Sequence, residues 1–456
     1  MTGLGPLDSG FMELEDTDRH ISLGIGAVAI LAGPAPTRAE FTAAMTSSSA
    51  RNIRLRQRVR RATLDLTAPV WEDDPNFDLA HHLRWTALPE PGDEAALREL
   101  VATEFEERLD RDHPLWQCVV VEHLTDSRWA LIIKAHHTMV DGVSGISLFT
   151  SFCDPESGTR APRTSTGTRR RTGVFDMAAQ GIRLSLATPR MAIDLARALI
   201  PVVSAAVTPT VESSFNGPIG RQRRYAVARA SLADIGEIRA AFDVTVNDVA
   251  LAAVASAYRT VLYERGEEPT ADKIRILVPV SMRREDAKYV LDNRVSAMLP
   301  YLPIEMSDPV ERLAAVHRRI SRHRSRGEAE AEKSVLSMAD RLPFALVAWT
   351  LRLAMHYPQH GVSALATNVP GPTHKLSLLG REVMEILPCI PIAMRLRTTI
   401  AILSYTDRLT FGITGDYDTT PDIDLIAEGI EHTITELLER ARTGVASVIR
   451  TEDLGP

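Results

Sequence analysis

Residues 128–142 read RWALIIKAHHTMVDG, and this stretch decides how the rest of the chain is interpreted. Its first eight residues, Arg128 to Ala135, form an apolar run typical of a buried strand. The segment before it, PLWQCVVVEHL (114–124), predicts another strand, which begins at Pro114, where a missing N–H is tolerated. The short turn at 125–127 joins the two, so we predict neighbouring strands that end at a histidine pair.

The histidine pair His136-His137 is the strongest candidate for chemistry. Successive side chains at a strand end project to opposite faces, so only one imidazole need point into a cleft. A neutral histidine has a pKa near 6.5 and can take a proton at physiological pH. Asp141 is close enough in sequence to hold this loop, either by touching the imidazole or by pairing with a distant arginine. Gly142 permits a tight turn into a helix over 143–152.

The same chain contains a second histidine pair, His81-His82, in the segment FDLAHHLRW. No Asp-Gly follows it at the spacing found after His137, so we predict an ordinary surface or interface role. A zinc site needs three or four ligands, and HHxxxD is not the i, i+4 pattern of a metal-binding helix. GxSxG, P-loop and strand-to-helix GxGxxG motifs do not occur. Direct transfer assisted by a histidine base is therefore favoured over a covalent intermediate.

Further elements follow from apolar patterns and helix capping signals. In the first part of the chain we predict a strand over 20–32 and helices over 38–49 and 93–109. In the second part we predict strands over 225–232, 274–282, 293–304, 362–368, 398–405 and 409–415, and helices over 232–242, 246–264, 308–325, 335–357 and 423–442. Strands and helices mix without strict alternation, which predicts an α+β (mixed α/β) fold.

The length of 456 residues predicts two or three domains. Residues 154–173 are rich in Pro, Gly, Ser, Thr and Arg, a linker composition, and residues 175–208 read as helices interrupted by prolines. We therefore predict an N-terminal domain over 1–153, a linker with crossover helices over 154–215, and a C-terminal domain over 216–456.

Composition narrows the possible partners. The net charge is −7 and 24% of residues are charged, so a global basic field that would attract nucleic acid is absent. The three cysteines, Cys118, Cys153 and Cys389, are far apart, which fits a reducing, cytoplasmic compartment. We expect no signal peptide, and no apolar run reaches the roughly 18–20 residues of a spanning helix. Contact with the inner membrane face or with lipid droplets would then be peripheral, through 175–208 or 335–357 unless these are core helices.

Two asparagines are candidates for substrate contact. Thr245 to Asp248 resembles a capping box at the start of the 246–264 helix, and Gly266 is placed to end it. Asp248 is interpreted as a structural member of that box, while Asn247 is a candidate to offer its amide to substrate or to the HHxxxDG loop. Asn368 lies in TNVPGP (367–372), whose other residues shape a turn. Trp116 is interpreted as a packing residue.

Six further motifs occur in order around HHxxxDG: PLDSGFMELE (6–15), PLW (114–116), VNDVALAAV (246–254), LVPVSMR (277–283), DNRVSAML (292–299) and TNVPGP (367–372). Together they resemble the bacterial wax ester synthase/diacylglycerol acyltransferase family, especially actinobacterial triacylglycerol synthases. HHxxxDG itself is the signature of the wider CoA-dependent acyltransferase superfamily. The resemblance runs from about residue 4 to about residue 440.

The resemblance implies two chloramphenicol-acetyltransferase-like domains with a tunnel between them and His137 as the general base. Long-chain acyl-CoA would be a co-substrate, without a bound cofactor or metal, and a lipid alcohol the acceptor. Diacylglycerol would yield triacylglycerol, and fatty alcohols would yield wax esters. An acyltransferase for another lipid or polyketide hydroxyl, or a silent lipid-binding paralogue, remains open. Relatives often carry glycine where this chain has Asp292, and commonly Gly or Asn where it has MRLRTTIAI (394–402), which bears on acceptor choice.

Overall fold

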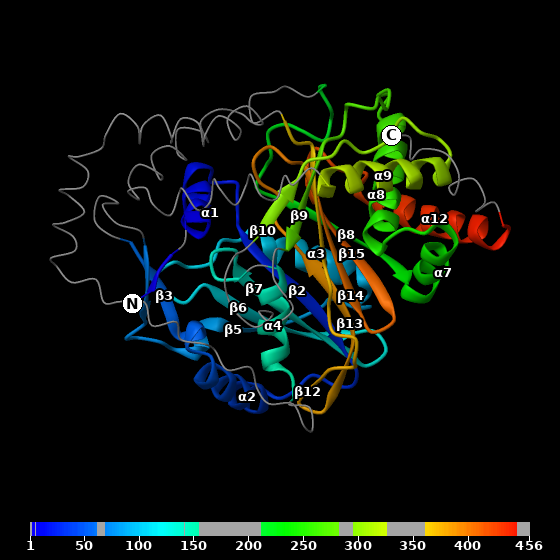
Figure 1. Ribbon diagram of the computed structural model, residues 1–456. Coiled ribbons are helices and arrows are strands. Elements are labelled where there is room, and N and C mark those ends of the chain that lie inside the picture. Colours follow the sequence, from blue (N-terminus) through cyan, green and yellow to red (C-terminus); the bar gives the residue numbers. More distant parts are fainter. Residues whose placement is uncertain are drawn as a thin grey trace, which may run out of the picture.

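The computed structural model describes residues 2–4, 6–61, 69–140, 142–154, 211–281, 295–325 and 361–444. These residues form two six-stranded sheets and a small sheet of three strands, with helices packed around them (Figure 1). The α+β prediction is confirmed. The predicted linker over 154–173, the helical stretches over 175–208 and 335–357, and Asp292 and Asn293 fall outside the described residues.

The N-terminal sheet has the order β12-β13-β2-β7-β6-β5. Its strands are β12 (Ser377–Leu378), β13 (Arg381–Cys389), β2 (Gly24–Leu31), β7 (Arg128–His136), β6 (Trp116–Leu124) and β5 (Leu83–Ala87). The predicted pair of neighbouring strands is confirmed, since β6 and β7 run antiparallel and pair from Trp116 to Leu124. Asp126 and Ser127 in the turn between them have φ of 60° and 51°, as tight hairpin turns require.

The C-terminal sheet has the order β10-β9-β11-β14-β15-β8. Its strands are β10 (Val295–Met298), β9 (Ile276–Ser281), β11 (Ala364–Val369), β14 (Thr398–Tyr405), β15 (Arg408–Asp416) and β8 (Arg223–Ser231). The strand expected over 293–304 is described only as far as Met298. Beyond it, Pro300 interrupts the regular ladder because proline cannot donate, and pairing continues only as an isolated bridge between Arg275 and Tyr301.

Strand β13 crosses from the second part of the chain into the first sheet, where it pairs antiparallel with β2. The sequence-based division, which placed all of 216–456 in the second domain, did not anticipate this exchange. Tyr225 of β8 also donates its hydroxyl to the carbonyl of Pro388 in β13, at 2.9 Å. The two sheets are therefore linked by the chain crossing into β13 and by this side-chain hydrogen bond.

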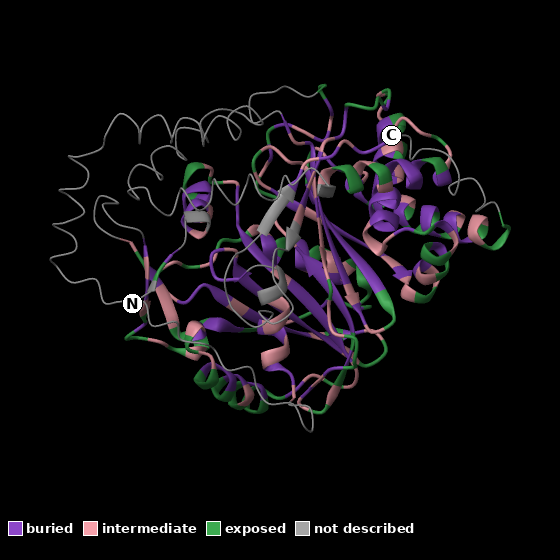
Figure 2. Cartoon of the chain, in the orientation of Figure 1, coloured by how far each residue is buried: buried purple, intermediate pink, exposed green. Residues whose placement is uncertain are grey.

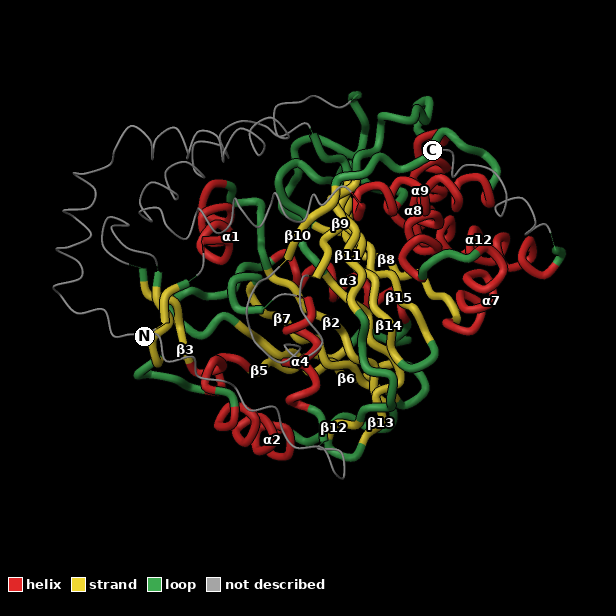
Figure 3. The backbone as a smooth tube through the Cα atoms, viewed as in Figure 1, coloured by secondary structure: helices red, strands yellow, loops and turns green. Residues whose placement is uncertain are grey.

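Helices cover both sheets. They are α1 (Pro6–Thr17), α2 (Arg38–Arg51), α3 (Glu94–Glu106), α4 (Gly142–Phe152), α7 (Leu232–Phe242), α8 (Val246–Glu264), α9 (Pro309–Ser325) and α12 (Ile423–Arg442). Helices α7, α8, α9 and α12 gather on one side of the molecule beside the C-terminal sheet, as Figure 3 shows. Two short 3-10 helices, η1 (Ile53–Arg56) and η3 (Leu79–His82), and the small sheet of β1 (Thr2–Gly3), β4 (Val70–Asp73) and β3 (Gln57–Arg60) complete the described fold.

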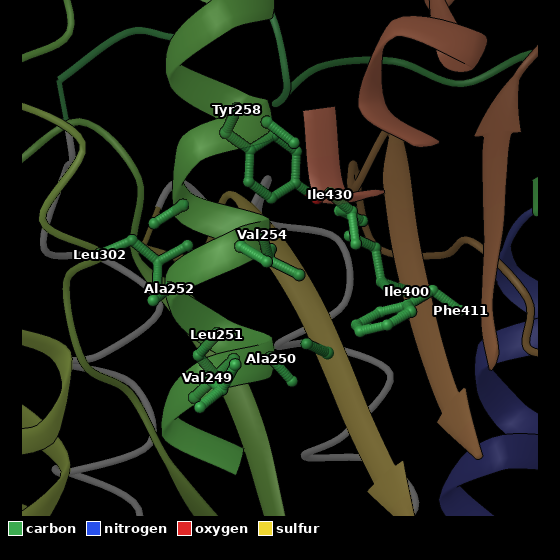
Figure 4. Packing of buried hydrophobic residues seen from close by; sticks show 14 of the residues in the cluster. Val249, Ala250, Leu251, Ala252, Val254, Tyr258, Leu302, Ile400, Phe411 and Ile430 are labelled. Carbon is green, nitrogen blue, oxygen red and sulfur yellow. The ribbon is translucent and has the colours of Figure 1, made fainter. Parts of the chain in front are cut away.

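Helix α8 is the centre of the C-terminal core. The predicted capping box is present: the Asp248 N–H donates to Thr245 Oγ1 at 3.2 Å, and the Thr245 N–H donates to Asp248 Oδ2 at 2.9 Å. Gly266 follows the helix with φ of 72°, as predicted for a terminating glycine. Val254 and Tyr258 point toward Ile400 and Phe411 of the sheet (Figure 4), and all four are fully buried.

Burial differs between the sheets and the helices that cover them. The strands are largely buried, whereas the outer faces of α2, α9 and α12 are exposed (Figure 2). Among the described helices, no single one is long and apolar enough to cross a membrane; the bent pair α7 and α8 meets that test jointly, on length and composition alone.

Candidate active site

The histidine pair lies at the end of β7, where backbone hydrogen bonds fix its position. The backbone N–H of His136 donates to the carbonyl of Leu115 at 2.9 Å, and that of His137 donates to the carbonyl of Leu23 at 2.9 Å. The neighbouring chain segments thus hold the backbone of both histidines. This placement follows from the strand prediction, because a residue at the last ladder position has its direction fixed by its neighbours.

His136 is buried, with 1% of its surface exposed. Its Nδ1 accepts the backbone N–H of Thr138 at 3.1 Å. In the neutral imidazole the proton must then sit on Nε2, which faces Glu15 Oε2 at 3.5 Å. That distance is longer than an ordinary hydrogen bond, so the contact between the two groups is mainly electrostatic.

Glu15 is the buried carboxylate behind this histidine. Its Oε1 accepts the backbone N–H of Leu23 at 2.9 Å, and its Oε2 accepts Arg111 Nε at 3.2 Å. Burial raises the pKa of the Glu15 carboxyl, but His136, the Leu23 N–H and Arg111 together outweigh that effect and lower the pKa to about 2. Glu15 is therefore an anion at neutral pH.

His137 lies in a different environment from its neighbour. It is only partly buried, and its ring lies against that of Phe11, with the centroids 4.1 Å apart and the planes tilted by 33°. The residue predicted as the base is thus the more accessible member of the pair. Asp141 lies outside the described residues, so its partner stays a prediction, and Gly142 is the first residue of α4, consistent with the expected turn into a helix.

A mostly apolar cavity runs between the two sheets beside this motif. It holds about 650 Å³ of empty space, its opening to solvent included. Ala135 and Val140, which flank the histidine pair, contribute to its wall, as does Phe149 of α4. Val369 of β11 and Ile402 of β14 face it from the C-terminal sheet. A hollow lined by both sheets is thus found where a tunnel between the two domains was expected.

The two candidate asparagines are brought together although 121 residues separate them. Asn368 Nδ2 donates to Asn247 Oδ1 at 3.4 Å, a long hydrogen bond. Thr367 and Val369 line the cavity, and side chains alternate along a strand, so the Asn368 side chain leaves β11 on the opposite face. The pair bridges β11 to the first turn of α8. Substrate contact by either residue remains a prediction.

Asp248 does more than cap α8. It is buried, with 1% exposed, and its Oδ2 also accepts Nδ1 of His317 on α9 at 2.9 Å. The predicted capping role of Asp248 is therefore confirmed, and one carboxylate oxygen links two helices of the C-terminal part.

Two kinds of chemistry lack support among the described residues. No group of three or more His, Cys, Asp or Glu side chains there could hold a metal ion. Cys118, Cys153 and Cys389 are buried free thiols. Burial raises the pKa of Cys153 and Cys389 to about 12 and that of Cys118 as well, so these thiols are protonated at neutral pH and are not activated nucleophiles.

Sequence reasoning missed Glu15, Phe11 and Arg111 as site residues. Helix α1 was not predicted as an element, although its sequence was quoted as the PLDSGFMELE motif. The available signal was an acidic residue inside that motif, among the apolar residues Met12, Leu14 and Ile21, all of which are buried. Its partner Arg111 lies 96 residues further along the chain and has no local signal.

Comparisons with known proteins agree with this geometry. A family model described as "Wax ester synthase/diacylglycerol acyltransferase catalytic domain" matches residues 4–250, and one described as "WS/DGAT C-terminal domain" matches residues 291–438. "Probable diacyglycerol O-acyltransferase tgs1" of Mycobacterium tuberculosis (strain ATCC 25618 / H37Rv) is 42% identical over 445 residues, which is 96% of each chain. "O-acyltransferase WSD" of Acinetobacter baylyi is 27% identical over 389 residues, covering 81% of this chain and 83% of that protein.

Solved structures show the same fold. The wax ester synthase/diacylglycerol acyltransferase from Marinobacter aquaeolei VT8 superposes with a TM-score of 0.69 at 25% identity, covering 97% of this chain and 100% of that one. The first condensation domain of the calcium-dependent antibiotic synthetase superposes with a TM-score of 0.61 at 16% identity, covering 100% and 99%. The second likeness concerns the fold alone.

Proposed function

The chain belongs to the wax ester synthase/diacylglycerol acyltransferase family, and from this premise we propose that it transfers a long-chain acyl group from acyl-CoA to the free hydroxyl of diacylglycerol. The product is triacylglycerol. The observation that carries the proposal is the partly buried His137 at the end of β7, whose neighbours Ala135 and Val140 open onto a cavity lined by both sheets.

In the proposed reaction His137 is the general base. Its unprotonated ring nitrogen takes the proton of the acceptor hydroxyl while that oxygen attacks the carbonyl carbon of the acyl-CoA thioester. The tetrahedral intermediate collapses with cleavage of the C–S bond, and the thiolate of CoA receives the proton from the imidazolium. Thiols with a pKa near 8.5 are good leaving groups. A positioned base contributes about 10²- to 10⁴-fold, and juxtaposition of the two substrates supplies much of the rest.

The lining of the cavity supports long-chain substrates. Burial of an acyl chain in an apolar environment stabilises the complex by about 0.8 kcal/mol per methylene. Residues such as Ile133, Val140 and Leu403 offer apolar surface for such a chain. Acyl-CoA is a substrate in this scheme, and no resident cofactor or metal is required.

Fatty alcohols are a second class of acceptor, and their esterification would give wax esters. The description of the matching catalytic-domain family names both activities, and a long alcohol has the same apolar character as the cavity. Another lipid or polyketide hydroxyl is a further alternative. A silent lipid-binding role is disfavoured because the described part of the motif keeps both histidines in an organised site.

We also propose peripheral contact with the cytoplasmic membrane face or with lipid droplets, because both the acceptor and the product are insoluble in water. Flotation with vesicles containing anionic phospholipid tests this. Association with the vesicles supports the proposal, and full recovery of the protein in the unbound fraction contradicts it.

A thiol-release assay tests the catalytic proposal. Palmitoyl-CoA is supplied with diacylglycerol or with hexadecanol, and CoA release is compared between the wild type and His137→Ala. Acceptor-dependent release that collapses in the variant supports the proposal, and the two rates rank the acceptors. Unchanged release by a folded His137→Ala protein removes this residue as the base. No release from the wild type with either acceptor points to another hydroxyl or to a binding role.

A further inference from the structure

One face of helix α1 contacts three successive residues of the catalytic motif. Asp8, Phe11 and Glu15 are spaced i, i+3 and i+7, which places them on the same side of a helix. The carbonyl of Asp8 accepts the Thr138 hydroxyl at 3.0 Å, the ring of Phe11 lies 4.1 Å from that of His137, and the carboxylate of Glu15 faces His136 at 3.5 Å. Helix α1 thus runs antiparallel to His136–Thr138, and each of these three residues contacts one residue of the helix.

Glu15 reaches both histidines through different routes. It faces the His136 imidazole directly, and it accepts the N–H of Leu23, whose carbonyl in turn accepts the N–H of His137. Leu23 is itself buried, with 3% exposed. The side chain of one histidine and the backbone of the other are therefore held by a single carboxylate.

A second element keeps that carboxylate in place. Arg111 lies in the segment between α3 and β6, and its guanidinium donates both to Glu15 Oε2 and to Asp16 on the exposed side of α1. The neighbouring Arg108 donates to the backbone carbonyls of Glu15 and Asp18 at the end of α1. These bonds tie α1 to the segment that leads into β6, the strand paired with β7.

We propose that this face of α1 is a template that holds the histidine pair in its working geometry, with Glu15 as its principal positioning residue. The inference rests on the proposed acyl transfer. Glu15 does not touch the reacting atoms: together with the Thr138 N–H at Nδ1 it stabilises the His136 tautomer with the proton on Nε2, and through Leu23 it fixes where His137 meets the acceptor hydroxyl. Arg111 supports it, and Phe11 limits the rotation of the His137 ring.

The test compares Glu15→Gln with Glu13→Gln, measured on the full chain with palmitoyl-CoA and diacylglycerol. Glu13 lies on the same helix and is also buried, but it is two residues from Glu15, on another side of the helix, and its carboxylate is 3.6 Å from Arg61. We expect kcat of Glu15→Gln to fall about 10- to 100-fold, the size of loss found when the carboxylate partner of a metal-ligating histidine is removed, with KM changed less than threefold. Glu13→Gln should keep kcat within about twofold of the wild type.

A spectroscopic readout separates positioning from simple destabilisation. In protein labelled with ¹⁵N-histidine, the two ring nitrogens report the tautomer, and loss of the His136 signal in His136→Asn assigns it. We expect the wild type and Glu13→Gln to show the Nε2–H form at His136 and Glu15→Gln to show a mixture or the other form. An unchanged tautomer together with unchanged kcat in folded Glu15→Gln overturns the inference.

Failure of Glu15→Gln to fold and absence of activity in the wild type have different consequences for the inference. If Glu15→Gln does not fold, Arg111→Met takes its place, since it removes the cation that supports the carboxylate; unchanged kcat in that variant contradicts the template. If the wild type releases no CoA, the proposed function fails, whereas the tautomer measurement still decides whether Glu15 positions His136.

Discussion

The chain contains two histidine pairs, and their surroundings explain why only one of them is a candidate for chemistry. Each pair has one buried member, His136 with 1% and His82 with 2% exposed. His82 stacks on Trp116, with ring centroids 4.5 Å apart and planes within 10°, and its Nδ1 lies 2.8 Å from the Trp116 carbonyl. His136 instead faces an ionised carboxylate. Both pairs pack against an aromatic ring, but at the end of β7 a buried carboxylate also faces the buried histidine, at 3.5 Å.

The second histidine of each pair, His81 in one and His137 in the other, also differs in its surroundings. His81 is exposed and stacks on His113 at 4.5 Å, whereas His137 is partly buried against Phe11. The lining of the cavity includes Ala135 and Val140 beside one pair and none of residues 77–84 beside the other. Of the two pairs, only the one at the end of β7 combines a histidine held by a backbone N–H and a carboxylate with a cavity lined by residues next to the pair.

The largest expected effect is the loss of the base. His137→Ala should lower kcat for acyl transfer by about 10²- to 10⁴-fold, because proton removal from the hydroxyl is then left to water. Initial rates of CoA release at saturating acceptor measure it, with the melting temperature as a control for folding. A loss smaller than tenfold would contradict the role assigned to this residue.

The free energy of unfolding at acid pH should reveal the contribution of the ionised Glu15 carboxylate beside His136. The pKa of Glu15 is about 2 in the folded chain against 4.5 ordinarily, so the ionised form stabilises the fold above pH 4.5 and that contribution is lost as the pH falls toward 2. At roughly 1.4 kcal/mol per pH unit the loss is about 3 kcal/mol. Urea unfolding at pH 6 and pH 3.5 tests this, and Glu15→Gln should show a shallower decline than the wild type. Parallel curves for the two proteins would refute the assignment.

The buried member of the other pair should affect stability and leave catalysis intact. Burial lowers the pKa of His82, and the nearby His113 and His81 add to this, so the folded state favours its neutral form. The unfolded chain binds the proton more readily, and His82 therefore makes the fold less stable as the pH falls below 6.5. His82→Asn, whose amide can still donate to the Trp116 carbonyl, should weaken this pH dependence. Unfolding curves at pH 7.5 and 5.5 measure it.

The smallest effect is expected at His81, which is exposed. His81→Gln should change the free energy of unfolding by no more than about 0.5 kcal/mol and leave kcat within twofold of the wild type. Thermal melts and the same CoA-release assay are sufficient. A tenfold fall in kcat here would mean that the second pair takes part in the reaction after all.

The sequence predicted correctly those helices and strands whose ends are marked by capping or turn residues. Helix α8 was expected over 246–264 and is found there, because Thr245, Asp248 and Gly266 define both ends. The β6–β7 pair was predicted from its two apolar runs and the turn between them. The histidine site was also visible, since HHxxxDG is contiguous in the sequence.

Features that depend on distant segments were not predicted. Strand β13 has no local signal for pairing with β2, which lies about 350 residues earlier in the chain. Glu15 acquires its role only when α1, the segment around Leu23 and Arg111 meet in the folded chain. The long bond between Asn368 and Asn247 likewise joins two candidates that sequence reasoning treated separately.

The most direct test of this account is a side-by-side measurement of kcat for His137→Ala and His82→Asn with palmitoyl-CoA and diacylglycerol. Both variants replace one histidine of a pair, and both must melt cooperatively to be compared. The account predicts that CoA release falls at least 100-fold in His137→Ala and stays within about twofold of the wild type in His82→Asn. Equal losses in the two variants, or full activity in His137→Ala, would contradict it.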